Sequence, residues 1–335
     1  MPMRTLFSIQ PLYLPPQSTP TVLVERALAS PFGASPLADS IHPQDHICIL
    51  VDDITRPTPH KVLLPPLLRA IGNCGVPDDH ITFLIALGTH RPMSREEMEH
   101  HLGSEITSRF HVLNHEYDNL DALFLAGEAP GGIPIYVNPL IQEADFSSRY
   151  QLIDVVAGDP VLAHRAGVER AKEIFLRPIP EPADIVVVDA HPADLEYWQG
   201  LKPLTLGHLA VKQGGILILQ GRFPEGISQT HRELYRYGRC SKKEFEQVLQ
   251  EGAIEDGAAI GALYQHILVR EYCTVFCVSP GLSDKDCEAL GFERFLTVEE
   301  ALKEAENRTS KQATVGYIAE GGETVPIPQN LESPC

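Results

Sequence analysis

The sequence predicts an α/β fold, with two α/β domains that contain mostly parallel sheets. Short apolar runs of strand length alternate with longer amphipathic stretches along most of the 335 residues, a pattern typical of parallel strands joined by helices. The length exceeds that of one ordinary domain of about 100–200 residues. We expect an N-terminal domain, shortened, over 1–150, a connecting helix and linker over 151–180, and a C-terminal domain over 181–335.

Local patterns predict the elements of the first half in turn. Pro59 suits the first turn of a helix that runs through Ile71, because that position needs no backbone donor. Ser94 followed by Glu97 has the spacing of a capping box, so a helix begins there and ends near Leu102. Strands are expected at His46–Asp53, Ile81–Leu87, Phe110–Leu113 and Ile133–Val137.

In the second half, apolar residues at helical spacing predict a helix over 158–175. The proline-rich tract 177–182 cannot continue it and is expected to cross between the domains. A helical pattern over 195–211 is expected to be interrupted at Pro203, and the tail after Gly321 to be loose. The other predicted elements are strands at Ile185–Asp189, Ile216–Leu219, Cys273–Val278 and Ala313–Ile318, and helices at Ser241–Gln250 and Val298–Glu306.

Composition excludes several classes of function. The formal charge of −18 without a long Lys/Arg run argues against nucleic acid and against an anionic membrane surface, since both need clustered cations. Seven cysteines include no CxxC pair and are expected to be reduced thiols. The N-terminal residues lack the apolar core of a signal peptide, and the apolar runs are short, so we expect a cytoplasmic protein. A small anionic ligand stays open, and so does the oligomeric state.

The segment 51–59 (VDDITRPTP) is the most informative for chemistry. A strand here delivers Asp52, Asp53, Thr55 and Arg56 to the carboxyl end of a sheet, where α/β proteins bind their ligands. An arginine at that place can hold a carboxylate or phosphate in two parallel hydrogen bonds. The alternative is a proline-rich turn in which an aspartate caps the backbone and pairs with Arg56.

The segment 88–93 (GTHRPM) also follows a strand and precedes a capped helix. His90 can exchange a proton near neutral pH, and the helix N-terminus favours anions. The alternative is that His90 only bonds a loop carbonyl. If the two strands are neighbours, their polar loops converge on one crevice.

The segment 191–202 (HPADLEYWQGLK) follows the strand expected at 185–189. Trp198 and Lys202 are four residues apart, hence on one helical face. An ammonium beside an indole suits a small carboxylate with an apolar body. The alternative is that Trp198 packs in the core while Lys202 reaches solvent.

These segments occur in a recognisable order: VDDITRPTP, GTHRPM, Asn114–His115–Glu116, AGDPVLAHRAGVERAKEIF and ADLEYWQGLK. The series, which covers most of residues 45–220, resembles the nickel-dependent lactate racemase family. The resemblance implies two α/β domains that face each other across a cleft. It also implies a nickel-pincer nucleotide tethered to a lysine, and racemisation or epimerisation of a small 2-hydroxy acid by hydride transfer.

The resemblance also implies roles for single residues. Asp53 and Arg56 match the acid and the arginine of the family's D-x-T-R-P motif, and Arg56 would bind the substrate carboxylate. His90 matches the histidine of G-T-H-R, a general base for the hydroxyl proton. Thr55 and Thr89 of the same two motifs would contact the cofactor.

In the later segment, Lys202 matches the lysine that completes carboxylate binding, four residues after an aromatic substrate-binding residue. That aromatic is Trp198 here, where the family often has tyrosine, so a phenolic hydrogen bond is expected to be missing.

One stretch of the family pattern is absent. Family members carry a cofactor-bearing lysine, a second catalytic histidine and a nickel-ligating histidine before the AGDPVLAHR segment. This chain has no lysine between Lys61 and Lys172 and no histidine between His115 and His164, so we assign no metal ligand. Two functions remain open: a racemase-class enzyme with a changed cofactor arrangement, or a non-catalytic or truncated relative that binds a small carboxylate or phosphate without the covalent cofactor. A dinucleotide fingerprint, which a dehydrogenase would be expected to show, is not present.

Overall fold

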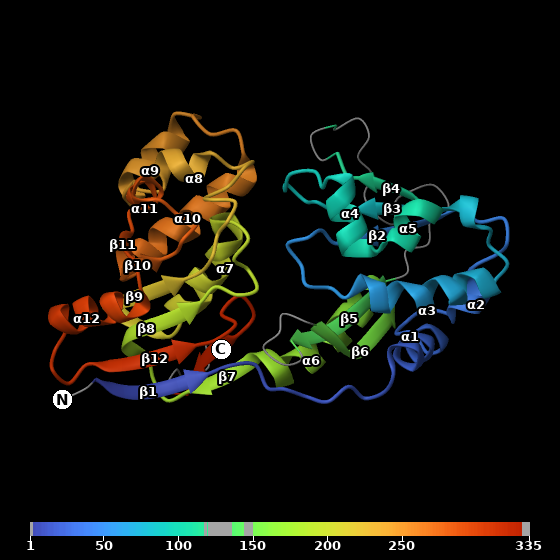
Figure 1. The fold of residues 1–335 in the computed structure, drawn as a ribbon, viewed down its shortest axis with the longest axis horizontal. Helices are drawn as coiled ribbons and strands as arrows, with labels where there is room; N and C mark the ends of the chain where they lie inside the picture. Colours follow the sequence, from blue (N-terminus) through green and yellow to red (C-terminus); the bar gives the residue numbers. More distant parts are fainter. Residues whose placement is uncertain (1–2, 117–118, 120–135, 144–149, 330–335) are drawn as a thin grey trace. The chain divides into compact units, whose positions relative to one another are not determined.

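The computed structural model describes residues 3–116, 119, 136–143 and 150–329. The chain forms two compact units. We call Tyr13–Ile174 the N-terminal unit, and Met1–Leu12 together with Phe175–Cys335 the C-terminal unit. Both combine helices with sheets that are mostly parallel (Figure 1), which confirms the predicted α/β class with mostly parallel sheets.

The N-terminal unit is built on a parallel sheet of three strands in the order β2-β3-β4. Each of these strands lies within two residues of its predicted limits, at Ile47–Val51, Ile81–Ile85 and His111–Asn114. A separate antiparallel pair consists of β5 (Tyr136–Glu143) and β6 (Tyr150–Gly158). The strand expected at 133–137 falls largely outside the described residues, and β6 was not expected. The helices are α1 (Pro20–Ala29), α2 (Leu37–Ser40), α3 (His60–Asn73), α4 (Arg95–Leu102), α5 (Ser104–Arg109) and α6 (Pro160–Phe175), with a short 3-10 turn at Asp78–His80.

One face of the three-stranded sheet supports the core of this unit. The central strand β3 buries every second residue, and its fully buried Phe83 and Ile85 belong to a core that also contains Leu23 of α1 and Leu64 of α3. This alternation follows from the two-residue period of a strand. The core therefore fixes the central strand, and with it the loops that leave the sheet at its carboxyl edge.

The C-terminal unit is built on a six-stranded sheet in the order β1-β12-β8-β9-β10-β11, in which every pairing is parallel. Its strands are β1 (Arg4–Ile9), β8 (Ala183–Asp189), β9 (Val211–Gln220), β10 (Thr274–Val278), β11 (Glu293–Phe295) and β12 (Thr314–Ile318). Its helices are α7 (Tyr197–His208), α8 (Glu233–Tyr237), α9 (Lys242–Gln250), α10 (Gly257–Tyr272), α11 (Asp284–Leu290) and α12 (Val298–Arg308).

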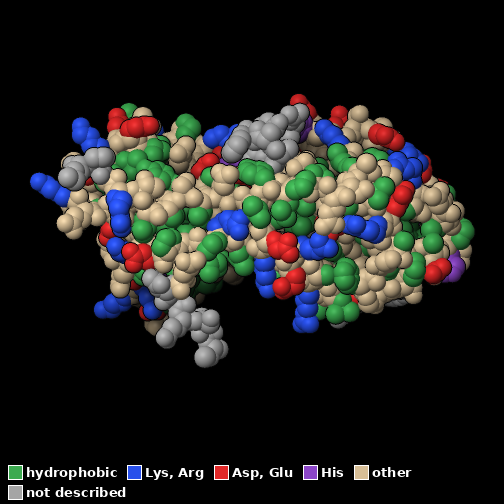
Figure 2. Space-filling model, turned by 90° about the horizontal axis from the view of Figure 1, so that it is seen from below, with side chains coloured by type: hydrophobic (Ala, Val, Ile, Leu, Met, Phe, Trp, Pro, Cys, Tyr) green, Lys and Arg blue, Asp and Glu red, His purple; other side chains and the backbone are tan. Residues whose placement is uncertain are grey.

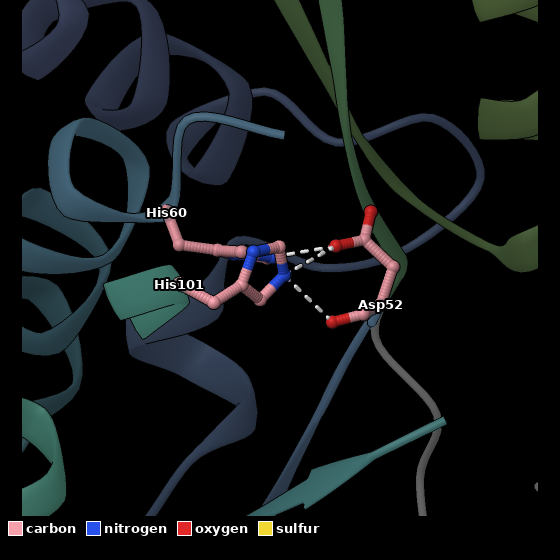
Figure 3. Close-up of side chains that lie close together, drawn as sticks. All are labelled: Asp52, His60 and His101. Atoms are coloured by element: carbon pink, nitrogen blue, oxygen red, sulfur yellow. Dashed lines mark hydrogen bonds and ion pairs between the residues drawn. The ribbon is translucent and has the colours of Figure 1, made fainter. Parts of the chain in front are cut away.

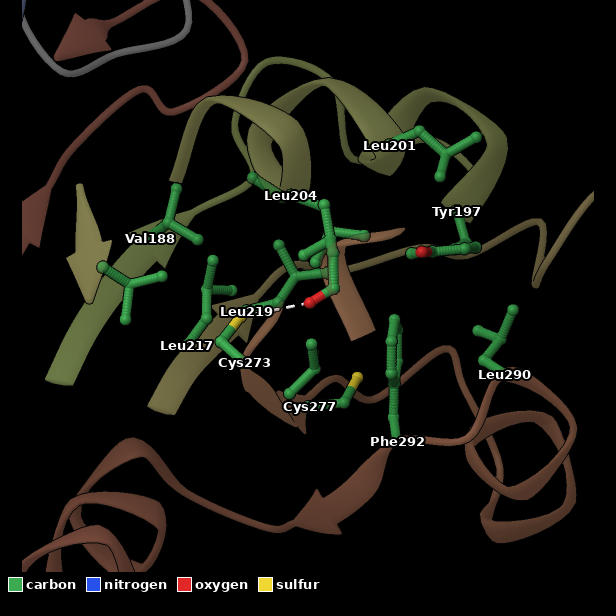
Figure 4. Packing of buried hydrophobic residues seen from close by; sticks show 14 of the residues in the cluster. Val188, Tyr197, Leu201, Leu204, Leu217, Leu219, Cys273, Cys277, Leu290 and Phe292 are labelled. Atoms are coloured by element: carbon green, nitrogen blue, oxygen red, sulfur yellow. Dashed lines mark hydrogen bonds between the residues drawn. The ribbon is translucent and has the colours of Figure 1, made fainter. Parts of the chain in front are cut away.

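Helices cover both faces of this sheet. Val186 and Val188 of β8 point into the core formed with α7 and α10, which also contains Tyr197 and Leu204 (Figure 4). The alternate residues of β8 pack on the other face with α12, through Ala301 among others. A strand buried on both faces has a continuous run of apolar residues, and this run is why β8 could be predicted from the sequence.

Three segments differ from expectation. Helix α7 continues through Pro203, because the hydrogen bond that proline removes is outweighed by the burial of Tyr197, Leu201 and Leu204 on the same helix. The proline-rich tract is not a plain crossover, since its first residues form β7 (Leu176–Ile179), which pairs with β13 (Val325–Pro328). The prediction of a loose tail after Gly321 is therefore wrong up to residue 328, because residues 325–328 form β13.

The strand β1 joins the C-terminal sheet by pairing with β12. The domain boundary at residue 150 stays a prediction. The structure groups residues 1–12, which include β1, with the C-terminal unit. A single six-residue strand carries no information about its partner, so only the long-range pairing places it.

Among the described residues, none of the helices is both long and apolar enough to cross a bilayer. On the face drawn in Figure 2, Lys and Arg side chains lie interspersed with Asp and Glu.

The predicted capping box at the start of α4 is confirmed. The Ser94 hydroxyl accepts from the Glu97 amide at 3.2 Å, and the Glu97 carboxylate accepts from the Ser94 amide at 2.8 Å. Replacing Ser94 by alanine is expected to lower the free energy of unfolding by about 1 kcal/mol. Urea denaturation of wild-type protein and Ser94→Ala measures this, and an unchanged midpoint would contradict the role of the cap.

Candidate functional site

The polar segments of the N-terminal unit gather at one edge of its sheet. Val51 pairs with Ile85, and Ile85 pairs with Asn114, so the three strands end at the same level. The strands are thus neighbours, which is the condition under which the loops after β2 and β3 were expected to converge. Figure 1 shows β2, β3 and β4 side by side.

Asp53 and His90 form the centre of this edge. The Asp53 carboxylate is buried, with only 4% of the residue exposed. One of its oxygens accepts from the amide and the hydroxyl of Thr55, at 2.9 and 2.6 Å, and the other lies 2.5 Å from His90 Nδ1. Burial alone raises the pKa of Asp53, but the hydrogen bonds from His90 and Thr55 outweigh it and hold this pKa below its ordinary value.

The His90 loop is held by backbone geometry and by Asn114. The His90 amide donates to the carbonyl of Leu87 at 3.0 Å, and Gly88 adopts a φ of +59°, which glycine tolerates better than other residues. The Asn114 side chain accepts from the Met93 amide at 3.1 Å and donates to the Met93 carbonyl at 2.9 Å. Asn114, one of the residues of the ordered motif series, thus positions the loop that carries His90.

Arg56 and the two threonines complete this group. Arg56 is exposed, its amide donates to the Asp53 carbonyl at 3.0 Å, and its Nη1 donates to the Thr55 hydroxyl at 2.9 Å. Thr55 therefore links the buried acid to the exposed guanidinium. Thr89 lies half-buried beside His90. The structure brings these residues together, and their roles toward a ligand stay predictions.

A second constellation was missed from the sequence. Asp52, His60 and His101 lie together, each able to offer one ligand atom, with these atoms all within 4.8 Å of one another. Figure 3 shows both imidazole rings directed at Asp52, His60 at its carboxylate and His101 also at its backbone carbonyl. Asp52 stands in the 51–59 motif, whereas no sequence pattern connects His60 or His101 with it.

The contacts around Asp52 are short. His60 Nε2 lies 2.6 Å from Asp52 Oδ1, and His101 Nε2 lies 3.4 Å from the same oxygen and 3.0 Å from the Asp52 carbonyl. The Thr58 hydroxyl donates to Asp52 Oδ2 at 2.5 Å. Burial raises the pKa of Asp52, but the hydrogen bonds from His101, His60 and Thr58 dominate, and this pKa falls well below its usual range. The carboxylate is therefore ionised at neutral pH.

In the C-terminal unit, Trp198 and Lys202 lie on α7 as expected. Trp198 is partly buried against the core and stacks on His231, with ring centroids 3.6 Å apart. Lys202 is half-buried and its Nζ donates to Gln199 Oε1 at 2.6 Å. Both the core interpretation of Trp198 and its proposed role beside a ligand are compatible with this placement.

His231 and Asp256 were also missed. His231 Nδ1 lies 2.6 Å from Asp256 Oδ2, and Asp256 caps α10 by accepting from the amides of Ala258 and Ala259 at 3.0 Å. An isolated histidine and an isolated aspartate 25 residues apart give no signal in one sequence. Only the packing of α10 against α7 brings the pair to Trp198.

Known proteins resemble this chain in both sequence and structure. A family model described as the lactate racemase N-terminal domain matches residues 2–155. A lactate racemase of Thermoanaerobacterium thermosaccharolyticum is 23% identical over 61% of the chain, and one of Lactiplantibacillus plantarum is 31% identical over 36% of it. The chain spans 66% and 28% of the lengths of these two relatives.

Two solved structures share the fold. The lactate racemase apoprotein of Thermoanaerobacterium thermosaccharolyticum superposes with a TM-score of 0.80 at 20% identity, over 97% of this chain and 95% of that one. A protein from Thermotoga maritima superposes with a TM-score of 0.61 at 16% identity, over 95% of this chain and 100% of that one.

Proposed function

Since the chain belongs to the lactate racemase-like family, we propose that it binds a small 2-hydroxy acid at Asp53, Arg56 and His90. The observation that carries the proposal is the buried Asp53 carboxylate that holds His90 Nδ1 at 2.5 Å. This pairing keeps the Nδ1 proton directed at Asp53, so Nε2 is the nitrogen that accepts the hydroxyl proton of the ligand.

Arg56 supplies the carboxylate-binding group of the proposal. Its guanidinium is exposed at the same edge, and its contact with the Thr55 hydroxyl orients it. A guanidinium can hold both oxygens of a carboxylate. The ligand is thus bound at its acid group by Arg56 and at its 2-hydroxyl by His90.

Replacing Arg56 by glutamine is expected to weaken lactate binding about tenfold, because a charge-assisted hydrogen bond contributes about 1.5–3 kcal/mol and exposure reduces it. Calorimetric titration with lactate measures this. Arg69→Gln is the matched control, since Arg69 is an arginine of the same unit that bonds Thr21 instead. Equal affinities of Arg56→Gln and wild-type protein would remove Arg56 from the proposal.

The choice of ligand tests the proposal as a whole. Lactate is expected to bind at least about tenfold more tightly than propionate, which lacks the 2-hydroxyl, and than methyl lactate, which lacks the carboxylate. Equal binding of all three compounds, or no binding of lactate, would overturn the assignment.

The tethered nickel nucleotide of the family does not fit the lysines of the N-terminal unit. That unit contains two lysines, Lys61 and Lys172. Lys172 lies on α6 with its Nζ 2.6 Å from Glu169, and the stem of Lys61 lies along Gly103 at the end of α4. Neither contact directs an amine at Asp53 or His90. The proposal therefore assigns no role to the tethered nucleotide. The intact mass of the purified protein tests this point separately, and the mass of the unmodified chain is expected.

In the C-terminal unit we propose Lys202 as a further carboxylate-binding group. The support is the match of the 194–202 segment to the family pattern and the half-buried ammonium held by Gln199. The non-catalytic alternative predicts the same binding without turnover. Chiral analysis of lactate after incubation with the protein distinguishes the two.

A further inference from the structure

The structure assigns a binding site for one divalent transition-metal ion to Asp52, His60 and His101, with Zn²⁺ as the ion that fits best. The three ligand atoms come from three different elements. Asp52 follows β2, His60 is the first residue of α3, and His101 lies in the last turn of α4. The inference does not depend on the proposed hydroxy-acid function.

The donor set selects the class of ion. Two imidazole nitrogens and one carboxylate oxygen suit Zn²⁺ and its first-row neighbours, whereas Mg²⁺ and Ca²⁺ prefer sites made of oxygen alone. Three protein ligands leave a fourth tetrahedral position open, as is usual for zinc sites that hold a water or a substrate. The backbone carbonyl oxygen of Asp52 lies 3.0 Å from His101 Nε2 and is a further oxygen beside the three ligand atoms.

One of the distances between the ligand atoms already matches that of a bound ion. Zinc lies about 2.0–2.1 Å from nitrogen and about 2.0–2.2 Å from oxygen, so two ligands of a tetrahedral site are about 3.3–3.4 Å apart. His101 Nε2 and Asp52 Oδ1 are 3.4 Å apart, while His60 Nε2 is 2.6 Å from that oxygen. The distance of 2.6 Å is that of a hydrogen bond between His60 Nε2 and Asp52 Oδ1. A small rotation of the His60 ring would lengthen it enough for an ion to replace the proton of this hydrogen bond.

The surroundings also support ligation. Asp52 Oδ2 accepts from Thr58, which leaves Oδ1 directed at the two histidines and orients the carboxylate as the outer partners of metal ligands do. His60 is 4% exposed, and its Nδ1 is buried without a hydrogen-bond partner in the part of the chain that the structure describes. The unpaired atom is Nδ1 and not the proposed ligand atom, so the support for ligation comes from the buried ring and from the position of Nε2 beside Asp52 Oδ1.

The ion would join the loop after β2 to the start of α3 and the end of α4. The same loop continues into Asp53 and Arg56, which makes the site a positioning device for the neighbouring group. Metal binding to the folded state alone also raises stability, by an amount that grows with the concentration of the ion.

The test is zinc titration of the full chain after removal of metals with EDTA, followed by calorimetry and by metal analysis of the dialysed protein. One Zn²⁺ per chain is expected, and Co²⁺ in the same site is expected to give the visible absorption of a tetrahedral complex. MgCl₂ is expected not to compete. Absence of stoichiometric zinc in wild-type protein would overturn the inference.

His100 and His101 offer a matched pair of variants on one helix. His101 lies in the cluster, whereas His100 is exposed. His101→Gln is expected to weaken zinc binding at least tenfold and to abolish the zinc-dependent rise in Tm, while His100→Gln behaves as wild type. If the two variants bind zinc equally well, the site is elsewhere.

Asp52→Asn serves as a second variant should His101→Gln fold poorly, with circular dichroism as the check on folding. It removes the carboxylate charge and keeps the side-chain shape, and the same loss of zinc binding is expected. Undiminished binding in a folded Asp52→Asn protein would also refute the assignment. Lactate affinity is not part of any of these measurements, so a failure here is distinct from a failure of the proposed function.

Discussion

Asp53→Asn is expected to weaken lactate binding about tenfold to a hundredfold while leaving the fold intact. The substitution keeps the shape of a buried side chain but removes the charge that faces His90. A charge-assisted hydrogen bond to a buried group contributes about 1.5–3 kcal/mol, which corresponds to this range of affinities.

The physical reason lies in the two nitrogens of His90. In the wild-type protein Nδ1 donates to the Asp53 carboxylate, which leaves the acceptor role to Nε2. Asp53 Oδ1 is bound by the Thr55 amide and hydroxyl, so the asparagine keeps its oxygen there and directs its amide group at His90. Nδ1 must then accept, and the proton moves to Nε2. The hydroxyl of the ligand loses its acceptor.

Calorimetry with lactate measures the loss, and nitrogen NMR of the histidine side chains reports the change of tautomer. Asp78→Asn is the matched control, because Asp78 forms an exposed ion pair with Arg109 in the same unit, with Nη2 2.7 Å from Oδ1. A similar loss in Asp78→Asn would indicate a general effect of charge. A changed tautomer with unchanged affinity would show that His90 does not contact the ligand.

Much of the fold is predictable from this sequence because its signals are local. The strand β8 is a run of apolar residues buried on both faces, and the start of α4 carries its own capping box. The pairing of β1 with β12 and of β7 with β13 is not predictable in this way. Those pairings join segments far apart in the chain, and a short strand does not specify its partner.

The candidate site divides along the same line. Asp53, Arg56 and His90 stand directly after strands, so the general rule that ligands bind at the carboxyl ends of parallel strands placed them together. His60 and His101 belong to helices, and neither local sequence contains a metal-binding spacing. Only the packing of α3 and α4 beside the end of β2 brings them to Asp52.

Acidification is expected to destabilise the C-terminal unit through His266. This residue is fully buried, its Nδ1 lies 2.6 Å from the Tyr197 hydroxyl, and its Nε2 lies 2.9 and 3.0 Å from the carbonyls of Gly238 and Leu290. The neutral ring satisfies all of these partners, with Nδ1 as acceptor and Nε2 as donor. Burial first, and then the charge of Arg270, lower the pKa of His266 to about 3.

The sign follows from the protons bound in each state. An unfolded histidine has a pKa of about 6.5, so between that value and about 3 the unfolded chain binds one more proton than the folded chain. Stability from this group is complete above pH 6.5 and is lost as the pH falls, by about 1.4 kcal/mol per unit. The loss at pH 5 amounts to about 2 kcal/mol.

His266→Gln isolates this contribution, because glutamine retains an acceptor and a donor but does not titrate. The variant is less stable than wild type at pH 7, and the difference is expected to shrink by about 2 kcal/mol between pH 7 and pH 5. Urea unfolding followed by the fluorescence of Trp198, the single tryptophan of the chain, reports on this unit because Trp198 lies on α7. Other acidic groups and histidines titrate equally in both proteins, so they cancel in the difference. Parallel stability curves would mean that His266 is protonated in the folded protein at pH 5, which its buried pairing with Tyr197 makes unfavourable.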